Sequence, residues 1–470
     1  EGLTAAALAA WARVIPKAFS ETMISALEVS IPSHLSHNLV HLNLSALSLG
    51  CDAVRKLAAG LGQCTVLQRL ELSNNKIGEN GATQLAECLS RCVALSLLDL
   101  SFNAIRTGVR PIAEALGQCL ELTSLSLRAN ALIPGALESM RALSSCRKLS
   151  CLELAYNRLS PAQNNSAFDF LSASISSLNL RNTGLPPGCH FTSLRHCTSL
   201  TFLQICDNNL RHDGIMSLVP IVSRLMALRH LDISNSCCTS HALGPLSQSL
   251  ASCTGLVSLK LAGTLLMGAV PLDSRLTSLT SLDLSDNEHM AMDSVSSVVE
   301  RNTNLADLKI TNCNELGSDA RKLARFAEAL LRCPDLRSLD LEGNAVTDEG
   351  VRLLSLGALA QLSRLTSLDL SNTSVGLDGV PHVCAALWSS AACLEQLLLG
   401  CWKHDDRARV RLGPEGTTRL AATLPACARL AFLDLEGALM GDAGASALGG
   451  ALGALSALER LELANKGVGA

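Results

Sequence analysis

The stretch Leu67–Ile77, with the sequence LQRLELSNNKI, decides the fold of this chain. Its pattern is L-x-x-L-x-L-x-x-N-x-[LIV], and it returns at Leu95–Ile105, Leu122–Leu132 and Leu149–Leu159. A fixed period of this length is typical of a solenoid, in which similar coils stack on one another. The pattern therefore predicts repeated coils before any other feature of the chain is considered.

The leucine at position four of this pattern can be followed through most of the chain. Leucines at positions one, four and six fall on one side of a short strand and its following turn, whereas positions three, five and seven face the other way. Sixteen leucines occupy position four, about 28 residues apart on average: Leu42, Leu70, Leu98, Leu125, Leu152, Leu178, Leu203, Leu231, Leu259, Leu282, Leu308, Leu339, Leu368, Leu397, Leu433 and Leu461.

Position nine is frequently an asparagine. An amide carries two donors and an acceptor oxygen, so it can bond to the backbone of neighbouring coils. Because a buried amide must be satisfied, we expect a ladder of these side chains where the strands turn into loops. Seven repeats have the asparagine: Asn75, Asn103, Asn130, Asn157, Asn208, Asn287 and Asn344.

The second half of each repeat has the spacing of a helix. Leu85, Ala86, Leu89 and Cys92 recur at steps of three and four, which marks one helical face. Strands joined by such crossovers run parallel. Because strands stack at about 4.8 Å and helices at about 8–10 Å, we expect a curved solenoid with the strands on its concave face.

A long repeat with a full helix, and with a cysteine three residues before the next leucine, resembles the ribonuclease-inhibitor-like subfamily of leucine-rich repeats. The resemblance covers residues 39–470. It implies an α/β leucine-rich-repeat solenoid, or horseshoe, of about sixteen repeats with helices on the convex face. It implies little about function, because that family includes inhibitors, GTPase activators, innate sensors and cytoskeletal scaffolds.

The unbroken period predicts one elongated domain over 39–470, since each coil contacts only its neighbours. Residues 1–38 do not fit the pattern, and Leu8, Trp11 and Phe19 predict an amphipathic N-terminal cap there. The repeat near 260–282 is short, and we expect an extended or 3₁₀ crossing in it instead of a helix. The charged insertion 401–412 is expected to project from the solenoid edge.

The cysteines follow the repeat. Since eight of the nineteen lie in one structural position, we interpret them as small apolar core residues and not as disulfide partners. This favours a reducing compartment such as the cytoplasm, with a cytoskeletal or organellar assembly as a further possibility. The eight are Cys64, Cys92, Cys119, Cys146, Cys197, Cys253, Cys333 and Cys427.

Composition and motifs argue against several functions. Net charge is −4 with a pI near 6.3, and without a basic stripe we expect no direct reading of nucleic acid. No apolar run reaches the length of a membrane span. The sequence contains no C-x-x-C pair, no phosphate-binding G-x-x-x-x-G-K-[ST] loop and no G-x-S-x-G or H-E-x-x-H motif. We therefore expect no enzyme, and no catalytic, cofactor-binding or metal site.

The residues at position five give the main functional hypothesis. A row of like charges on one wall focuses a negative field, which would attract a basic segment of a partner protein. The competing interpretation is that these acids only keep the surface soluble. The nine acids of this acidic row, as we call it, are Glu71, Asp99, Glu153, Asp232, Asp283, Asp340, Asp369, Asp434 and Glu462.

Edge loops give a second candidate surface. Irregular loops on a rigid scaffold frequently carry function, and the candidates here are Trp402, Lys403, Arg407, Arg409 and Arg411. Together these features predict a non-catalytic interaction scaffold, as a subunit of a larger assembly. The alternative is a GTPase-activating protein of the leucine-rich-repeat type, for which the three loop arginines are the residues to test.

Overall fold

The structure is a computed structural model that describes residues 38–160, 168–313, 319–401 and 412–464. The cap expected at 1–38 lies outside the described residues except for Asn38, and the insertion lies outside them except for Cys401 and Leu412. The chain divides into two compact units, within Glu1–Ser236 and within Cys237–Ala470.

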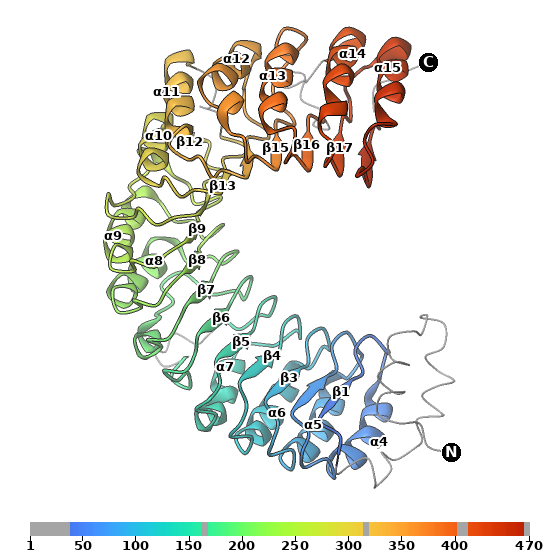
Figure 1. Ribbon diagram of the computed structural model, residues 1–470. Coiled ribbons are helices and arrows are strands. Elements are labelled where there is room, and N and C mark those ends of the chain that lie inside the picture. The colour runs from blue at the N-terminus through green and yellow to red at the C-terminus, as the bar shows by residue number, and fades with distance from the viewer. Residues whose placement is uncertain (1–37, 161–167, 314–318, 402–411, 465–470) are drawn as a thin grey trace. The chain divides into compact units, whose positions relative to one another are not determined.

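In the first unit, each repeat contributes a three-residue strand centred on its position-four leucine. Neighbouring strands are parallel and pair leucine with leucine, for example Leu42 with Leu70 and Leu70 with Leu98. Figure 1 shows these strands side by side in chain order. They are β1 (His41–Asn43), β2 (Arg69–Glu71), β3 (Leu97–Asp99), β4 (Ser124–Ser126), β5 (Cys151–Glu153), β6 (Ser177–Asn179), β7 (Phe202–Gln204) and β8 (His230–Asp232).

Helices return the chain between most strands of this unit. They are α4 (Cys51–Leu61), α5 (Gly78–Leu89), η2 (Arg106–Gly108) leading into α6 (Val109–Leu116), α7 (Ala136–Ser139), η3 (Met140–Ser145), η4 (Thr192–His196) and α8 (Arg211–Val222). A full helix is expected in the regular repeats, and this is wrong between β4 and β5, where α7 and η3 are short. Between β6 and β7, a connection that is described throughout, η4 is likewise short. Pro134-Gly135 and Pro186-Pro187-Gly188 stand where those helices would begin, and proline and glycine disfavour helix there.

The second unit repeats this arrangement. Its strands pair in parallel and again place leucine beside leucine, as in Leu339 with Leu368. In the short repeat the backbone is extended, and β10 (Met267–Gly268) pairs there in parallel with β12 (His289–Met290) of the following repeat. The main strands are β9 (Ser258–Lys260), β11 (Ser281–Asp283), β13 (Asp307–Lys309), β14 (Ser338–Asp340), β15 (Ser367–Asp369), β16 (Gln396–Leu398), β17 (Phe432–Asp434) and β18 (Arg460–Glu462).

The helices of the second unit lie on one side of these strands (Figure 1). They are α9 (Ser240–Leu250), α10 (Met292–Arg301), α11 (Ala320–Leu330), α12 (Asp348–Gly357), η5 (Leu359–Gln361), α13 (Val380–Ser390), α14 (Gly413–Thr423), η6 (Leu424–Ala426) and α15 (Gly441–Leu452). The described residues contain sixteen repeat strands, eight in each unit, so the predicted leucine-rich-repeat fold is confirmed.

The core consists of the leucines that define the repeat. Leu67, Leu70, Leu72 and Ile77 are fully buried, and the equivalent residues of the other repeats are almost all buried too. Removing one such side chain to alanine costs about 2–5 kcal/mol, because the lost burial is compounded by a cavity. The repeat pattern is therefore the principal source of stability.

The position-nine asparagines form the expected ladder. In Asn130, the Nδ2 group donates to the Leu100 carbonyl of the preceding repeat at 2.8 Å. Its Oδ1 atom accepts from the amides of Asn103 at 3.1 Å and Ile105 at 3.4 Å. The equivalent bonds recur at the other position-nine asparagines, so each amide closes the loop of the repeat before it.

The cysteine position forms a second link between repeats. Within the described residues, none of the nineteen cysteines is in a disulfide. The Sγ of Cys119 lies 3.4 Å from the Leu89 carbonyl, and that of Cys146 lies 3.2 Å from the Leu116 carbonyl. These carbonyls end the helix of the preceding repeat, so the thiol satisfies a helix terminus as well as filling space.

Position eight adopts left-handed backbone in most repeats, with φ near +50 to +70°. This conformation is uncommon for residues other than glycine, asparagine and aspartate. The chain tolerates it here because the strand must end sharply before the asparagine. Phe102 and Tyr156 are the aromatic residues with this geometry, with φ of 58° at each.

Candidate functional site

The face of the sheet opposite the helices, which we call the strand face, carries positions three and five. In most strands the central leucine is buried, whereas the residues before and after it are half-buried. All nine members of the acidic row are described, and eight are half-buried at this face. Asp434 is the exception, at 4% exposed.

Most of these acids bond to their own strand end. A carboxylate oxygen of position five accepts a hydrogen bond from the backbone N–H of position seven, as from Ser371 to Asp369 at 2.8 Å. The same bond occurs at Asp99, Glu153, Asp232, Asp283, Asp340 and Asp434. Asn43 and Asn179 make it where the acid is replaced by an amide. Position five therefore has a structural role in ending the strand, independent of any partner.

The remaining two acids pair with arginine. Glu71 bonds to Arg69 of its own strand and also accepts from Asn43 at 3.0 Å. Glu462 bonds to Arg460 at 2.9 Å. These exposed pairs contribute about 0–1 kcal/mol each, so they do little for stability.

The register shows which charges are neighbours. In the second unit, position five reads Lys260, Asp283, Lys309, Asp340, Asp369, Leu398, Asp434 and Glu462 from strand to strand. The acids are thus not an unbroken row, because lysines flank Asp283. In the first unit, only Glu71 and Asp99 are directly adjacent. The negative charge concentrates from β14 onward.

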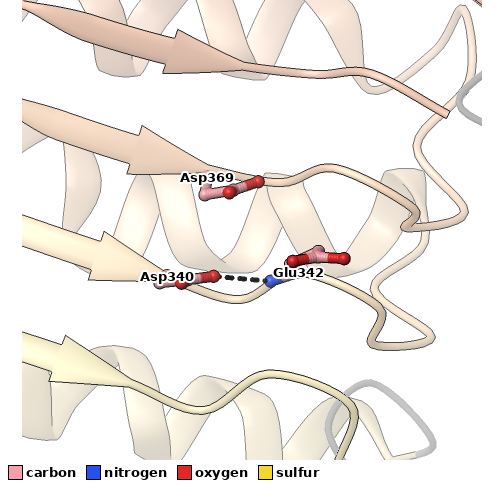
Figure 2. A group of neighbouring side chains, drawn as sticks. All are labelled: Asp340, Glu342 and Asp369. Atoms are coloured by element: carbon pink, nitrogen blue, oxygen red, sulfur yellow. Dashed lines mark hydrogen bonds between the residues drawn. The ribbon is translucent and has the colours of Figure 1, made fainter. Parts of the chain in front are cut away.

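The densest group is made by Asp340, Glu342 and Asp369, and Figure 2 shows it at the ends of β14 and β15. Carboxylate oxygens of the three side chains all lie within 4.8 Å of one another. Lys309 approaches Asp340 at 3.8 Å, and Asn372 donates to Glu342 at 3.1 Å. We call these three residues the carboxylate cluster.

Burial raises the pKa of several acids on this face. Asp369 is affected most: burial, and then the nearby charges of Asp340 and Glu342, raise its pKa to about 6. Burial also raises the pKa of Asp340, and here Lys309 counteracts the rise. The pKa values of Glu153 and Asp434 are raised for the same principal reason. The cluster therefore gains from a positive charge placed against it.

A metal ion is one way to supply such charge, but the geometry gives it limited support. Calcium takes six to eight oxygen ligands. In the carboxylate cluster, one oxygen of Asp340 already accepts from the Glu342 amide, and Glu342 accepts from Asn372. Of the described residues, this group comes nearest to a metal-binding arrangement, and nothing further in it points to an ion.

The edge-loop candidates Trp402, Lys403, Arg407, Arg409 and Arg411 lie outside the described residues. They are therefore a sequence-based hypothesis only.

A second group of side chains was missed by the sequence reasoning. Phe102, Arg128, Tyr156, Arg181 and Asp207 come from five successive repeats and contact one another in order. They occupy positions seven and eight, which no motif marks. The available signal was an arginine or aromatic residue in that place in repeat after repeat.

Comparisons with known proteins agree with this fold. A family model described as Leucine Rich repeat matches residues 63–86, 275–291 and 332–355. The chain is 29% identical over 305 residues to the ribonuclease inhibitor of Sus scrofa, covering 57% of the chain and 62% of that protein. It is 27% identical over 285 residues to NACHT, LRR and PYD domains-containing protein 5 of Bos taurus, covering 53% of the chain and 25% of that protein.

Among solved structures, the chain is similar to an internalin (inlF) of Listeria monocytogenes. The two share 16% identity over 97% of each chain, with a TM-score of 0.48. The repeat, the family matches and the curated relatives make the chain a leucine-rich-repeat protein related to ribonuclease-inhibitor-like proteins. It spans between a quarter and about three fifths of the length of the two curated relatives named above.

No helix in the described part of the chain combines the length and hydrophobicity that crossing a lipid bilayer requires.

Proposed function

We propose that this chain is a non-catalytic protein-interaction module, and that the strand face of its second unit binds a basic segment of a partner protein. Solenoids of this kind offer extended surfaces suited to binding proteins. The single observation that carries the basic partner is the carboxylate cluster, in which three acids lie within 4.8 Å.

Electrostatics supports this choice of partner. Each carboxylate of the cluster is partly withdrawn from water and repels the others, as the raised pKa of Asp369 reflects. A lysine or arginine brought to the cluster relieves that repulsion, and hydrogen bonds that involve charged groups are stronger than neutral ones. Glu436, Asp434 and Glu462 extend the negative surface toward β18.

The test is binding of a fluorescein-labelled peptide of alternating lysine and serine, followed by anisotropy, with the glutamine–serine peptide as a control. We expect the lysine peptide to bind, and its affinity to fall as the salt concentration is raised, because salt screens exposed charges. The double variant Asp340→Asn/Asp369→Asn should weaken binding about threefold or more.

A matched control removes the same charge elsewhere. Asp52→Asn/Glu114→Gln alters two exposed helix-side acids of the first unit and should leave binding unchanged. Affinity that stays constant from low to high salt, or that survives the double variant, contradicts the proposal.

We propose further that the protein acts within a larger assembly. A single exposed face on a repeat scaffold leaves its helical side and edges available to other subunits. Size-exclusion chromatography of the native complex tests this, and elution as a monomer from cell extract contradicts it. The GTPase-activating alternative depends on Arg407, Arg409 and Arg411, and no observation on the described residues favours it.

A further inference from the structure

A continuous ladder of side chains crosses the strand ends of the first unit. Arg128 lies over the ring of Phe102 at 5.7 Å and over the ring of Tyr156 at 4.6 Å. Arg181, from the repeat after Tyr156, also lies over the Tyr156 ring, at 5.5 Å, and it bonds to Asp207 at 2.6 Å. Asn235 then donates to Asp207 at 2.7 Å. We call these six residues the arginine–aromatic ladder.

The ladder is preorganised. At a strand spacing of about 4.8 Å, six repeats span about 24 Å, which an extended peptide of about seven residues would cover. Each arginine is held by a neighbouring ring, so binding would immobilise little additional side-chain freedom. Arginine and tyrosine are also enriched among the residues that dominate interface energies.

The two arginines differ in what satisfies them. The guanidinium of Arg181 has Asp207 as its partner. Within the described residues, the guanidinium of Arg128 has no hydrogen-bond or ion-pair partner, and its Nε is buried without one. A buried donor without an acceptor destabilises the folded chain, so an arriving acceptor would be favoured.

The position-five acids on the two strands flanking β4, the strand of Arg128's repeat, already have partners. Asp99 accepts from the amide and hydroxyl of Ser101, and Glu153 accepts from Ala155 and Asn179. The ladder itself holds two arginines and one aspartate, so it is net positive by one charge. A planar guanidinium with free donors binds a carboxylate through two parallel hydrogen bonds.

We propose that Arg128, clamped between Phe102 and Tyr156, is the anchor for an aspartate or glutamate side chain of an extended partner segment that runs along the arginine–aromatic ladder. This surface is in the first unit and has the opposite charge preference to the carboxylate cluster. It does not depend on the basic-partner proposal for the second unit.

The experiment is selection of a phage-displayed library of random linear peptides against the whole protein. We expect selected peptides to share one acidic position flanked by apolar residues. Synthetic copies should lose affinity about tenfold or more against Arg128→Gln, since a hydrogen-bonded charge pair is removed. Arg128→Lys, which keeps the charge but not the planar fork, should recover only part of the affinity.

Arg147→Gln is the matched control, because Arg147 is exposed and lies outside the ladder. It should bind the selected peptides like the wild type, as should Asp340→Asn/Asp369→Asn. Thermal melting of each variant verifies that it is folded.

Two results overturn the proposal. One is a selection on the wild type that yields no acidic consensus. The other is undiminished binding of acidic peptides to Arg128→Gln, in which case Arg128 serves only to neutralise Asp99 and Glu153.

Discussion

At position five, one side chain carries two properties that asparagine can separate. The carboxylate accepts the amide of position seven, and it also contributes charge to the strand face. Asparagine retains an acceptor oxygen and removes the charge. Asp→Asn variants therefore test electrostatics without breaking the strand end, and this is why they are the changes chosen for the carboxylate cluster.

The raised pKa of Asp369 predicts a pH-dependent stability. Its folded pKa of about 6 lies above the ordinary value of 3.8, so the native state binds a proton more readily than the unfolded state does. The free energy of unfolding should then increase as pH falls from about 7 to about 4. Asp369→Asn should stabilise the protein near pH 7, by roughly 1–2 kcal/mol after allowance for its partial exposure, and flatten this dependence.

Urea denaturation at a series of pH values measures this effect. Asp286→Asn is a suitable control, because it removes an exposed acid from another repeat of the same unit. A wild type and an Asp369→Asn variant with parallel stability curves between pH 4 and pH 7 would exclude the mechanism.

Asn130 should be among the least replaceable polar residues. Asn130→Ala removes the bonds to Leu100, Asn103 and Ile105 and leaves buried backbone groups unsatisfied. We expect a loss of about 2–3 kcal/mol in the free energy of unfolding, measured with urea. Asn209 is an exposed asparagine that follows position nine in its own repeat. Asn209→Ala should therefore change the free energy of unfolding by less than about 0.5 kcal/mol. Equal losses of stability from the two changes would contradict the stabilising role of the position-nine asparagines.

Gly400 is required by close approach to a carboxylate. A Cβ built there lies 2.5 Å from the Asp434 Oδ2 atom, so Gly400→Ala must displace it. We expect a loss of about 1–3 kcal/mol, and a smaller loss when Asp434→Ala is already present, because the clash is then absent. Gly255→Ala meets nothing within 4 Å and is the control. Strict additivity of the two changes would argue against the clash.

At the scale of the element, the place of a cysteine in the repeat decides how reactive its thiol is, because the cysteines that follow the helices are buried. Burial raises the pKa of Cys119 to about 12 and that of Cys146 to about 11, which leaves almost no thiolate near neutral pH. Cys237 is exposed. We therefore expect iodoacetamide to label Cys237 rapidly in the native protein, and Cys119 and Cys146 only after unfolding, as peptide mass spectrometry would show.

Labelling in urea provides the reference for full reactivity. Fast native labelling of Cys119 or Cys146 would mean that these thiols are not packed as described.

The elements were predictable to different degrees. Every position-four leucine lies in a strand, because its spacing directly encodes alternation and burial. The expectation of a full helix fails where Pro134-Gly135 interrupts the chain. The strand-ending bond at position five was missed because its acids were read only as charges, although their two-residue spacing from serine was visible. The arginine–aromatic ladder depends on left-handed backbone at Phe102 and Tyr156, which leucine spacing does not reveal.

At the scale of the whole molecule, stability in a repeat protein is a sum of local terms between neighbours. Leu368→Ala opens a cavity in the repeat of β15 and should cost about 2–5 kcal/mol. In hydrogen exchange we expect lost protection at β14, β15 and β16, and unchanged protection at β2 and β3. Leu356→Ala, at a side chain that is 63% exposed, should leave all five strands protected.

Uniform loss of protection through both units after Leu368→Ala would contradict this expectation. It would indicate a single cooperative unfolding unit in place of coupled neighbours.

The asparagine ladder gives the molecule a direction. Each amide at position nine seals the loop of the coil that precedes it and does nothing equivalent for the coil that follows. Removing one coil would consequently remove the asparagine hydrogen bonds that close the loop of the preceding coil. The loop of the following coil would keep its hydrogen bonds. When repeats are removed from or added to such an array, the junction should therefore be placed immediately after a turn that carries the asparagine. Every retained loop then keeps an asparagine amide to bond with it.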